Sequence, residues 1–281
     1  MSDVAVVGAG AIGSAVALRL LAAGHQVVVW NRTPGRSAEL LHAGAVPALT
    51  VQEAVSSSRL ILLTVKDYTA MRSCLEQIEG PLPGRTIVAM CTGSAADARL
   101  AAEQVARSGA EYLDAGIQAS AESIGTAAAT ILYSGSRGAF DRHSATLELL
   151  STPRFVGSSP DSAAVWDLAL FGLWYDAQLG LLRALDTVRG AGVDVAEFAE
   201  AASTQLGHVL AAVSATVGEA QDAVYPPGPA DLTEHLAVVR HLMDLRADQR
   251  LGDGGLREVA TRIEALIAAG HGSQGLTATI S

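Results

Sequence analysis

The chain has 281 residues, of which 49% are hydrophobic but only 4% aromatic, so alanine, valine and leucine must form most of its core. A chain of this length favours two domains and can bury a sizeable core without disulfide bonds. The formal net charge of −10 argues against a nucleic-acid-binding surface, because such surfaces gather lysine and arginine.

Cysteine usage and hydropathy point to a reducing, aqueous environment. The two cysteines, Cys74 and Cys91, have no neighbouring Cys/His cluster, which argues against a disulfide scaffold and a metal site. The first residues lack a basic region before the first apolar run, and charge or glycine interrupts the longest apolar stretches. We therefore expect a cytoplasmic protein that binds no metal, nucleic acid or membrane.

The first half of the chain alternates β-branched runs with alanine- and leucine-rich stretches. A helix is predicted over 14–24, where Gly24 ends it. Continuous apolar strands separated by helices predict a parallel sheet that is covered on both faces. The predicted strands lie within 4–10, 26–32, 59–65, 86–93, 111–117 and 130–136.

The pattern changes near residue 158. Pro160 lies where a helix could begin, Asp161 or Ser162 could cap it, and helical periodicity then continues to about Arg189. The remainder indicates helices joined by short breaks at 225–232 and 251–256. We predict one domain over residues 1–157 and a second, helical one over 158–281 that begins with the long helix.

A glycine-rich turn joins the first predicted strand to the first predicted helix. Gly8, Gly10 and Gly13 form the pattern G-x-G-x-x-G, with Ala9, Ala11 and Ile12 between them. Such glycines allow a tight turn and close backbone approach, so that a pyrophosphate can bind at the helix N-terminus. Together with the patterns along the chain, the turn predicts an α/β fold: an N-terminal Rossmann domain, then the long interdomain helix and an all-helical C-terminal domain.

The end of the second strand indicates which dinucleotide binds. An acidic residue there would bind the ribose of NAD, but this chain has the neutral Asn31 and Thr33 with the cationic Arg32 and Arg36. Arginine forms paired, charge-assisted bonds with a phosphate, so we predict NADPH. The remaining predicted coenzyme-binding residues lie at or just after the ends of later predicted strands; they are Val65, Lys66 and Cys91.

Several segments of the chain together resemble the NADPH-dependent imine reductases and reductive aminases of the β-hydroxyacid dehydrogenase superfamily. They include "GAGAIGSAVA", "NRTPGR", "YLDAGIQASAESIGT", "ILYSGS", "WDLALFGLWY", "YPPGPADLTEHL" and "AGHGSQGLTATIS". The resemblance covers nearly the whole chain. It implies hydride transfer to the C=N carbon of a small cyclic or secondary imine, and a homodimer with intertwined helical domains.

The resemblance assigns the catalytic roles to Asp167 and Tyr175 on the long helix, for substrate activation and proton delivery in either order. A carboxylate would favour an iminium cation beside it. Phe171 and Trp174 lie close to the same helical stripe as Asp167, so we expect them to line the substrate pocket. Without the resemblance, Asp167 could equally be an exposed helix residue, as we expect Asp176 to be.

Two alternative functions stay open at this point. Hydroxyacid dehydrogenases of the superfamily use a lysine on the long helix, whereas Lys66 is the only lysine of this chain. This disfavours a β-hydroxyacid dehydrogenase-like ketoreductase. A non-catalytic NADPH-binding protein is the second alternative, because Met90 replaces an asparagine that reductive aminases commonly carry. Further predicted pocket residues are Gln118, His208 and His235, although either histidine could be an ordinary surface or packed residue.

Overall fold

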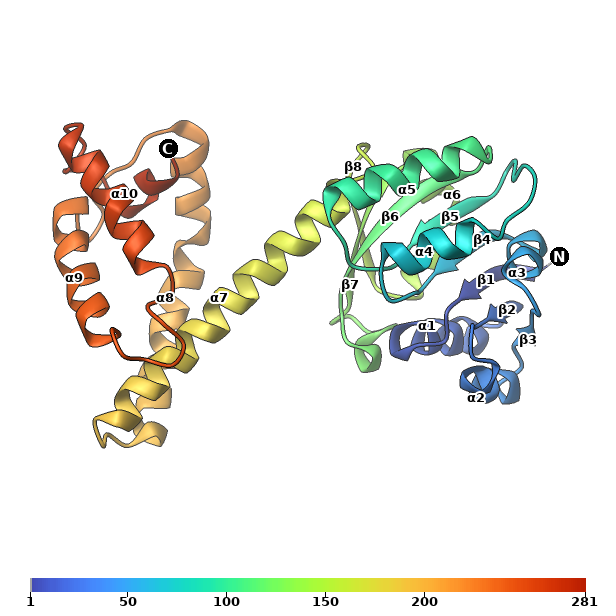
Figure 1. Ribbon diagram of the computed structural model, residues 1–281, viewed down its shortest axis with the longest axis horizontal. Coiled ribbons are helices and arrows are strands. Elements are labelled where there is room, and N and C mark those ends of the chain that lie inside the picture. Colours follow the sequence, from blue (N-terminus) through green and yellow to red (C-terminus); the bar gives the residue numbers. More distant parts are fainter. Residues whose placement is uncertain (1) are drawn as a thin grey trace. The chain divides into compact units, whose positions relative to one another are not determined.

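The computed structural model describes residues 2–281, which form two compact units that divide between Gly172 and Leu173. One unit contains all the strands and the other is made of helices (Figure 1). The predicted boundary after residue 157 stays a prediction. Contacts place the division later because the first turns of the long helix pack on the sheet, where Ala163, Ala164 and Asp167 are buried.

The first unit is built on one sheet of eight strands in the order β3-β2-β1-β4-β5-β6-β7-β8. The first six strands of this order run parallel, as predicted. Sheets of this kind bind ligands in the crevice where the strand order reverses, which here lies between β1 and β4. The strands are β1 (Ser2–Val7), β2 (Val27–Trp30), β3 (Val46–Pro47), β4 (Ser58–Leu63), β5 (Thr86–Ala89), β6 (Glu111–Gln118), β7 (Thr130–Gly135) and β8 (Thr152–Gly157).

The far edge of the sheet differs from the prediction. β7 runs antiparallel to β6, so the expectation of a fully parallel sheet was wrong there. The segment between these strands holds only a short 3₁₀ turn, Ala121–Ser123, whereas a parallel crossover usually needs a helix. β8 then pairs parallel with β7. Neither β8 nor the two-residue β3 was predicted.

Successive strand residues point to opposite faces of the sheet, so an apolar strand presents two apolar faces, and helices cover both. Val4 and Val6 of β1 pack on one face with α1, whereas Ala5 and Val7 pack on the other with α3, α4 and α5. The helices of this unit are α1 (Ala11–Ala22), α2 (Ala38–His42), α3 (Val51–Ser57), α4 (Tyr68–Leu75), α5 (Ala95–Arg107) and α6 (Arg137–Glu148), with a 3₁₀ turn at Pro34–Ser37.

The second unit is helical, as predicted. α7 (Ser162–Gly190) begins in the first unit and continues into the second, which also contains α8 (Val195–Asp222), α9 (Leu232–Leu245), α10 (Leu256–Ala268) and a final 3₁₀ turn, Leu276–Ile280. Its core lies between α9 and α10, where Leu232, Leu236 and Ile263 are buried. Over residues 2–281, no helix combines the length and the apolar character that a bilayer crossing requires.

Candidate active site

The glycine turn after β1 is shaped by close backbone contacts. Gly8 has a φ of +116°, and a Cβ there would lie 2.4 Å from the carbonyl oxygen of Thr64. A Cβ on Gly13 would lie 2.1 Å from the carbonyl oxygen of Gly8, so both positions require glycine. At Gly10, by contrast, a Cβ would meet nothing within 4 Å. Open space therefore lies beside the N-terminus of α1, where the backbone N–H groups favour an anion.

Asn31 ties this turn to the loop after β2. Its Oδ1 accepts a hydrogen bond from the N–H of Ala9 at 2.9 Å, and its Nδ2 donates to the carbonyl of Thr33 at 2.7 Å. Asn31 therefore fixes the wall of the site. Arg32 and Arg36 lie on the same wall and leave a cationic surface where a 2′-phosphate would bind.

These elements enclose a cavity of about 820 Å³ in the first unit. Most predicted coenzyme-binding residues line it; they are Gly8, Gly10, Ala11, Ile12, Gly13, Asn31, Arg32, Arg36, Val65, Lys66 and Cys91. Ala9 and Thr33 contribute through their hydrogen bonds to Asn31. Met90 and Phe171, predicted for the substrate pocket, also line the cavity. An open phosphate turn beside two arginines fits a phosphorylated dinucleotide.

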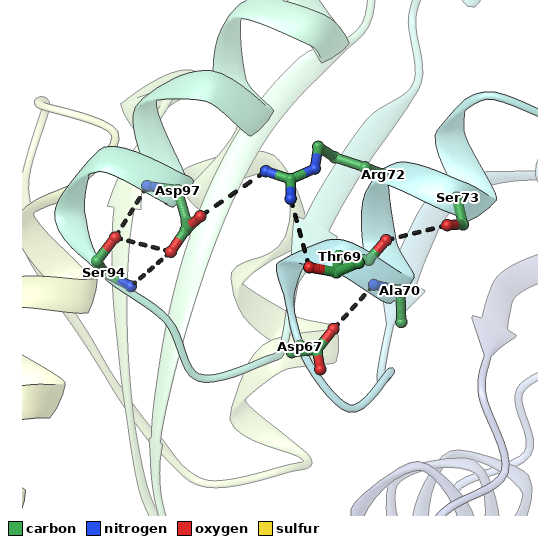
Figure 2. Close-up of polar contacts among 7 residues, drawn as sticks. All are labelled: Asp67, Thr69, Ala70, Arg72, Ser73, Ser94 and Asp97. Carbon is green, nitrogen blue, oxygen red and sulfur yellow. Dashed lines mark hydrogen bonds and ion pairs between the residues drawn. The ribbon is translucent and has the colours of Figure 1, made fainter.

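The loops after β4 and β5 are held by helix caps and by an ion pair (Figure 2). Asp67 caps α4 by accepting from the N–H of Ala70 at 2.9 Å, and Ser94 and Asp97 form a capping box on α5. Arg72 joins the two helices, with 3.8 Å between its Nη1 and Oδ1 of Asp97. The loops that present Lys66 and Cys91 to the cavity therefore end at fixed helix N-termini.

Sequence reasoning missed other cavity-lining residues. These are Trp30, Thr64, Asp67, Thr69, Ala70, Ser73, Cys74, Gln77, Thr92, Ala115, Ile117 and Ala119. A usable signal existed at Asp67, since an aspartate after a strand and before a helix is a typical N-cap. For the others, the strand ends locate the loops but not the side chains that face the cavity.

Asp167 is buried, at 3% exposure, which removes the interpretation as an exposed helix residue. Its Oδ1 accepts a hydrogen bond from Nε2 of Gln118 at 2.7 Å, and the same Nε2 lies 3.4 Å from its carbonyl oxygen. Burial raises the pKa of Asp167, whereas the hydrogen bond from Gln118 lowers it. Gln118 was predicted to affect the substrate pocket; its described partner is the carboxylate of Asp167.

A second buried carboxyl group, Asp114 on β6, was missed by the sequence analysis. It accepts hydrogen bonds from the hydroxyls of Tyr68 and Tyr112, the latter at 3.1 Å. Burial raises the pKa of Asp114 to about 6, although these hydrogen bonds and one from the N–H of Ala164 oppose the shift. The signal was an aspartate inside an apolar strand, where an unpaired charge would be costly.

The amino end of α7 is capped by the sheet. The N–H of Ala163 donates to Oγ of Ser134 at 2.9 Å, and the N–H of Ala164 donates to Asp114. Ser134 and Asp114 are direct partners in the β6–β7 ladder. Of the two predicted caps, Asp161 forms an ion pair with Arg99 of α5, and Ser162 is the first residue of α7. Two neighbouring strands thereby fix the helical turn that carries Asp167.

Cys91 is not set up as a nucleophile. Burial and the nearby carboxylates raise the pKa of its thiol, so the unreactive protonated form is favoured.

The other predicted site residues belong to the second unit. Trp174 and Tyr175 are 58% and 56% exposed, and their rings meet edge to face with centroids 5.0 Å apart. His208 is exposed on α8, and His235 is half-buried on α9. Their participation in a site with Asp167 stays a prediction.

Two protein-family models match this chain, one in each half. Residues 3–157 match the NAD binding domain of 6-phosphogluconate dehydrogenase, and residues 159–281 match the C-terminal domain of NADPH-dependent reductive aminase-like proteins. The NADPH-dependent reductive aminase of Aspergillus oryzae is 30% identical over 99% of this chain and 95% of its own. The 2-hydroxy-3-oxopropionate reductase of Escherichia coli is 31% identical, but over only 51% of this chain and 50% of its own.

Solved structures extend the likeness to the whole fold. An imine reductase from Aspergillus terreus, in complex with NADPH4 and dibenz[c,e]azepine, has a TM-score of 0.93 and 28% identity, covering 100% of this chain and 98% of its own. A reductive aminase from the same organism, in complex with NADPH and ethyl levulinate, has a TM-score of 0.91 at the same identity and coverage. The chain therefore belongs to the family of NADPH-dependent reductive aminases and imine reductases.

Proposed function

We propose that the protein reduces small cyclic or secondary imines and iminium ions to amines. NADPH supplies the hydride, which adds to the carbon of the C=N bond. The observation that carries the proposal is the buried carboxylate of Asp167, held by Gln118 at 2.7 Å at the sheet-capped end of α7. The lysine that hydroxyacid chemistry would need has no counterpart on α7, since Lys66 lies after β4.

The environment of Asp167 suits a cationic substrate. In a buried site, a carboxylate interacts with a nearby cation more strongly than it would in water. It therefore favours the protonated, more electrophilic form of an imine. A neutral ketone would gain much less from the same group. We assign Asp167 the role of proton source to a neutral imine and, once ionised, of electrostatic anchor for the iminium ion. Tyr175 orients the substrate nitrogen, with the reverse division of the proton step as the alternative.

Met90 narrows the expected substrates to preformed imines. It is 3% exposed, lines the cavity, and stands where reductive aminases commonly carry an asparagine. A thioether cannot donate the hydrogen bond that would hold the hydroxyl of a carbinolamine. We therefore expect coupling of a ketone with an amine to be slow relative to reduction of a preformed imine.

We also propose that the protein is a homodimer. Within the part of the chain that the structure describes, no residue of α8 is buried. An apolar stripe nevertheless runs along this helix with i, i+3, i+4, i+7 and i+11 spacing; it consists of Leu206, Val209, Leu210, Val213 and Val217. A stripe this long costs free energy in water, and a second copy of the chain would cover it.

The experiment that tests the activity follows NADPH absorbance with a cyclic imine. Parallel reactions contain 3-hydroxyisobutyrate with NADP⁺ or no substrate. We expect oxidation of NADPH with the imine only. Turnover of the hydroxyacid alone would instead support a ketoreductase, and NADPH binding without any turnover would support a non-catalytic role.

A further inference from the structure

One side of β6 is fitted to the first turns of α7. Asp114, Gly116 and Gln118 alternate along the strand and therefore share a face. Asp114 accepts from the N–H of Ala164, and a Cβ on Gly116 would lie 2.7 Å from the Cβ of Asp167. The missing side chain at Gly116 lets the helix approach closely enough for Gln118 to reach the carboxylate of Asp167.

We propose that Gln118 is a positioning residue, which orients the carboxylate of Asp167 and keeps it ionised for the bound iminium ion. The inference rests on the proposed function. It moves Gln118 from the expected role of a substrate contact to that of a partner of the catalytic group. Its amide nitrogen Nε2 lies 2.7 Å from Oδ1 and 3.4 Å from the carbonyl oxygen of Asp167, so one amide group spans two acceptors of the same residue.

The chemistry of the amide explains both effects. An amide N–H donates without carrying charge, so it stabilises the carboxylate and leaves its negative charge for the substrate. Asp167 is buried at 3% exposure, and a buried carboxylate that loses a hydrogen bond is protonated more readily. Without Gln118, Asp167 would require a higher pH to ionise, and its side chain could rotate away from the reacting position.

Other titratable groups around Asp167 also come from the sheet side. Asp114 on β6 lies close to Asp167, and the charge of Asp167 contributes to the raised pKa of Asp114. Tyr68 of α4 and Tyr112 of β6 lie behind Asp114, and burial raises the pKa of both phenols, which stay protonated. These groups are shared by the parent protein and by any Gln118 variant, so a difference between them reports on Gln118.

The test uses full-length enzyme, NADPH and an N-methylated cyclic iminium salt. This substrate carries a permanent charge and needs no proton, so the acidic limb of its pH–rate profile reports on the protein. The variants are Gln118→Met, which keeps the length but removes the donor, and Gln118→Glu, which adds a repelling carboxyl group. The matched control is Gln104→Met, on the partly exposed surface of α5.

For Gln118→Met we expect the acidic limb to move about one pH unit higher, as the loss of one hydrogen bond to a charged group predicts. We also expect kcat at neutral pH to fall about tenfold, with the Kd for NADPH unchanged. Gln118→Glu should move the limb at least as far. Gln104→Met should match the parent in all three quantities.

Two results would overturn the inference. One is a limb and kcat equal to those of the parent in both Gln118 variants. The other is a change confined to KM that varies with substrate size, which would make Gln118 a substrate contact. A failure of the proposed function would be seen without any Gln118 variant. Either an inactive parent enzyme or full activity in Asp167→Asn would contradict the proposed function.

Discussion

Asp167 and Asp114 are both buried carboxyl groups, but their partners give them different properties. The described side-chain donor to Asp167 is one neutral amide, whereas Asp114 receives two phenols and a backbone N–H. Both phenols donate to Oδ1 of Asp114, and these three donors tie it to α4, β6 and α7 as a structural acceptor. Asp167 keeps unfilled capacity, which a cationic substrate nitrogen can use. The difference fits a supporting role for Asp114 and the catalytic role that we propose for Asp167.

If Asp167 anchors the iminium ion, Asp167→Asn should lower kcat on a cyclic imine by about 100-fold, the scale of a lost acid–base group. Tyr175→Phe should cost about tenfold, as loss of one orienting hydrogen bond predicts. The Kd for NADPH, measured by fluorescence titration, should stay unchanged in both. Asp176→Asn, on the exposed surface of the same helix, is the control and should retain full activity. Parent-like kcat in the first two variants would contradict the assigned roles.

Asp114 should make stability depend on pH. Its pKa is about 6 in the folded protein and near 3.8 in the unfolded chain, so between these values the folded state binds more protons. The contribution of Asp114 to stability is therefore greatest at low pH and declines as pH rises toward 6. Asparagine has no such dependence. The free energy of unfolding of Asp114→Asn, relative to the parent, should thus rise by roughly 2 kcal/mol between pH 4.5 and 7.

Urea denaturation at several pH values measures this difference, and groups common to both proteins cancel. Asp141→Asn, at an exposed position of α6, is the control. A constant difference between Asp114→Asn and the parent across the range would mean that the folded protein does not raise the pKa of Asp114.

At the scale of elements, the sequence predicts those helices, strands and turns that residues close together in the chain determine. The strand, glycine turn and helix that begin the coenzyme site follow from neighbouring residues, as does the length of α7. The direction of β7 and the edge strand β8 depend on how distant segments pair. β8 is only partly buried and contains a proline, so its sequence carries little strand signal. Asp114 was missed, and the hydrogen bond from Gln118 to Asp167 was not foreseen, because in both cases partners lie on other elements.

The close fit of β6 against α7 predicts a large effect from a small substitution. In Gly116→Ala, the new methyl group would lie 2.7 Å from the Cβ of Asp167 and 3.1 Å from the carbonyl oxygen of Ala163, so α7 must shift. Overpacking of this kind costs about 1–3 kcal/mol of unfolding free energy. Because the shift displaces Asp167, kcat should also fall.

Gly138→Ala provides the control for this substitution. A Cβ there would meet nothing within 4 Å, and Gly138 lies in a helix, where alanine is favoured by about 1 kcal/mol. Thermal unfolding should therefore show lower stability for Gly116→Ala and higher stability for Gly138→Ala. Imine reduction is measured on both variants, and kcat should fall only in Gly116→Ala. Equal stability of the two variants would show that α7 does not pack on Gly116.

At the scale of the whole molecule, the two units differ in how far each buries its own apolar side chains. The sheet of the first unit is covered on both faces, whereas α8 of the second exposes a stripe that includes Leu210 at 74% exposure. The core between α9 and α10 leaves that stripe uncovered in a single chain. Predicted pocket residues such as His208 lie on this same exposed helix. Assembly and activity are therefore expected to depend on each other.

This dependence can be tested by placing a charge on the α8 stripe. Light scattering after gel filtration should give the parent protein twice the mass of the 28.8 kDa chain. Leu210→Glu should shift it to the single-chain mass, because a buried, unpaired carboxylate opposes association. Imine reduction should fall with the dimer fraction. Leu100→Glu, at an exposed leucine of the first unit, should leave mass and activity unchanged. A fully active single-chain parent would exclude any role for a second copy in the site.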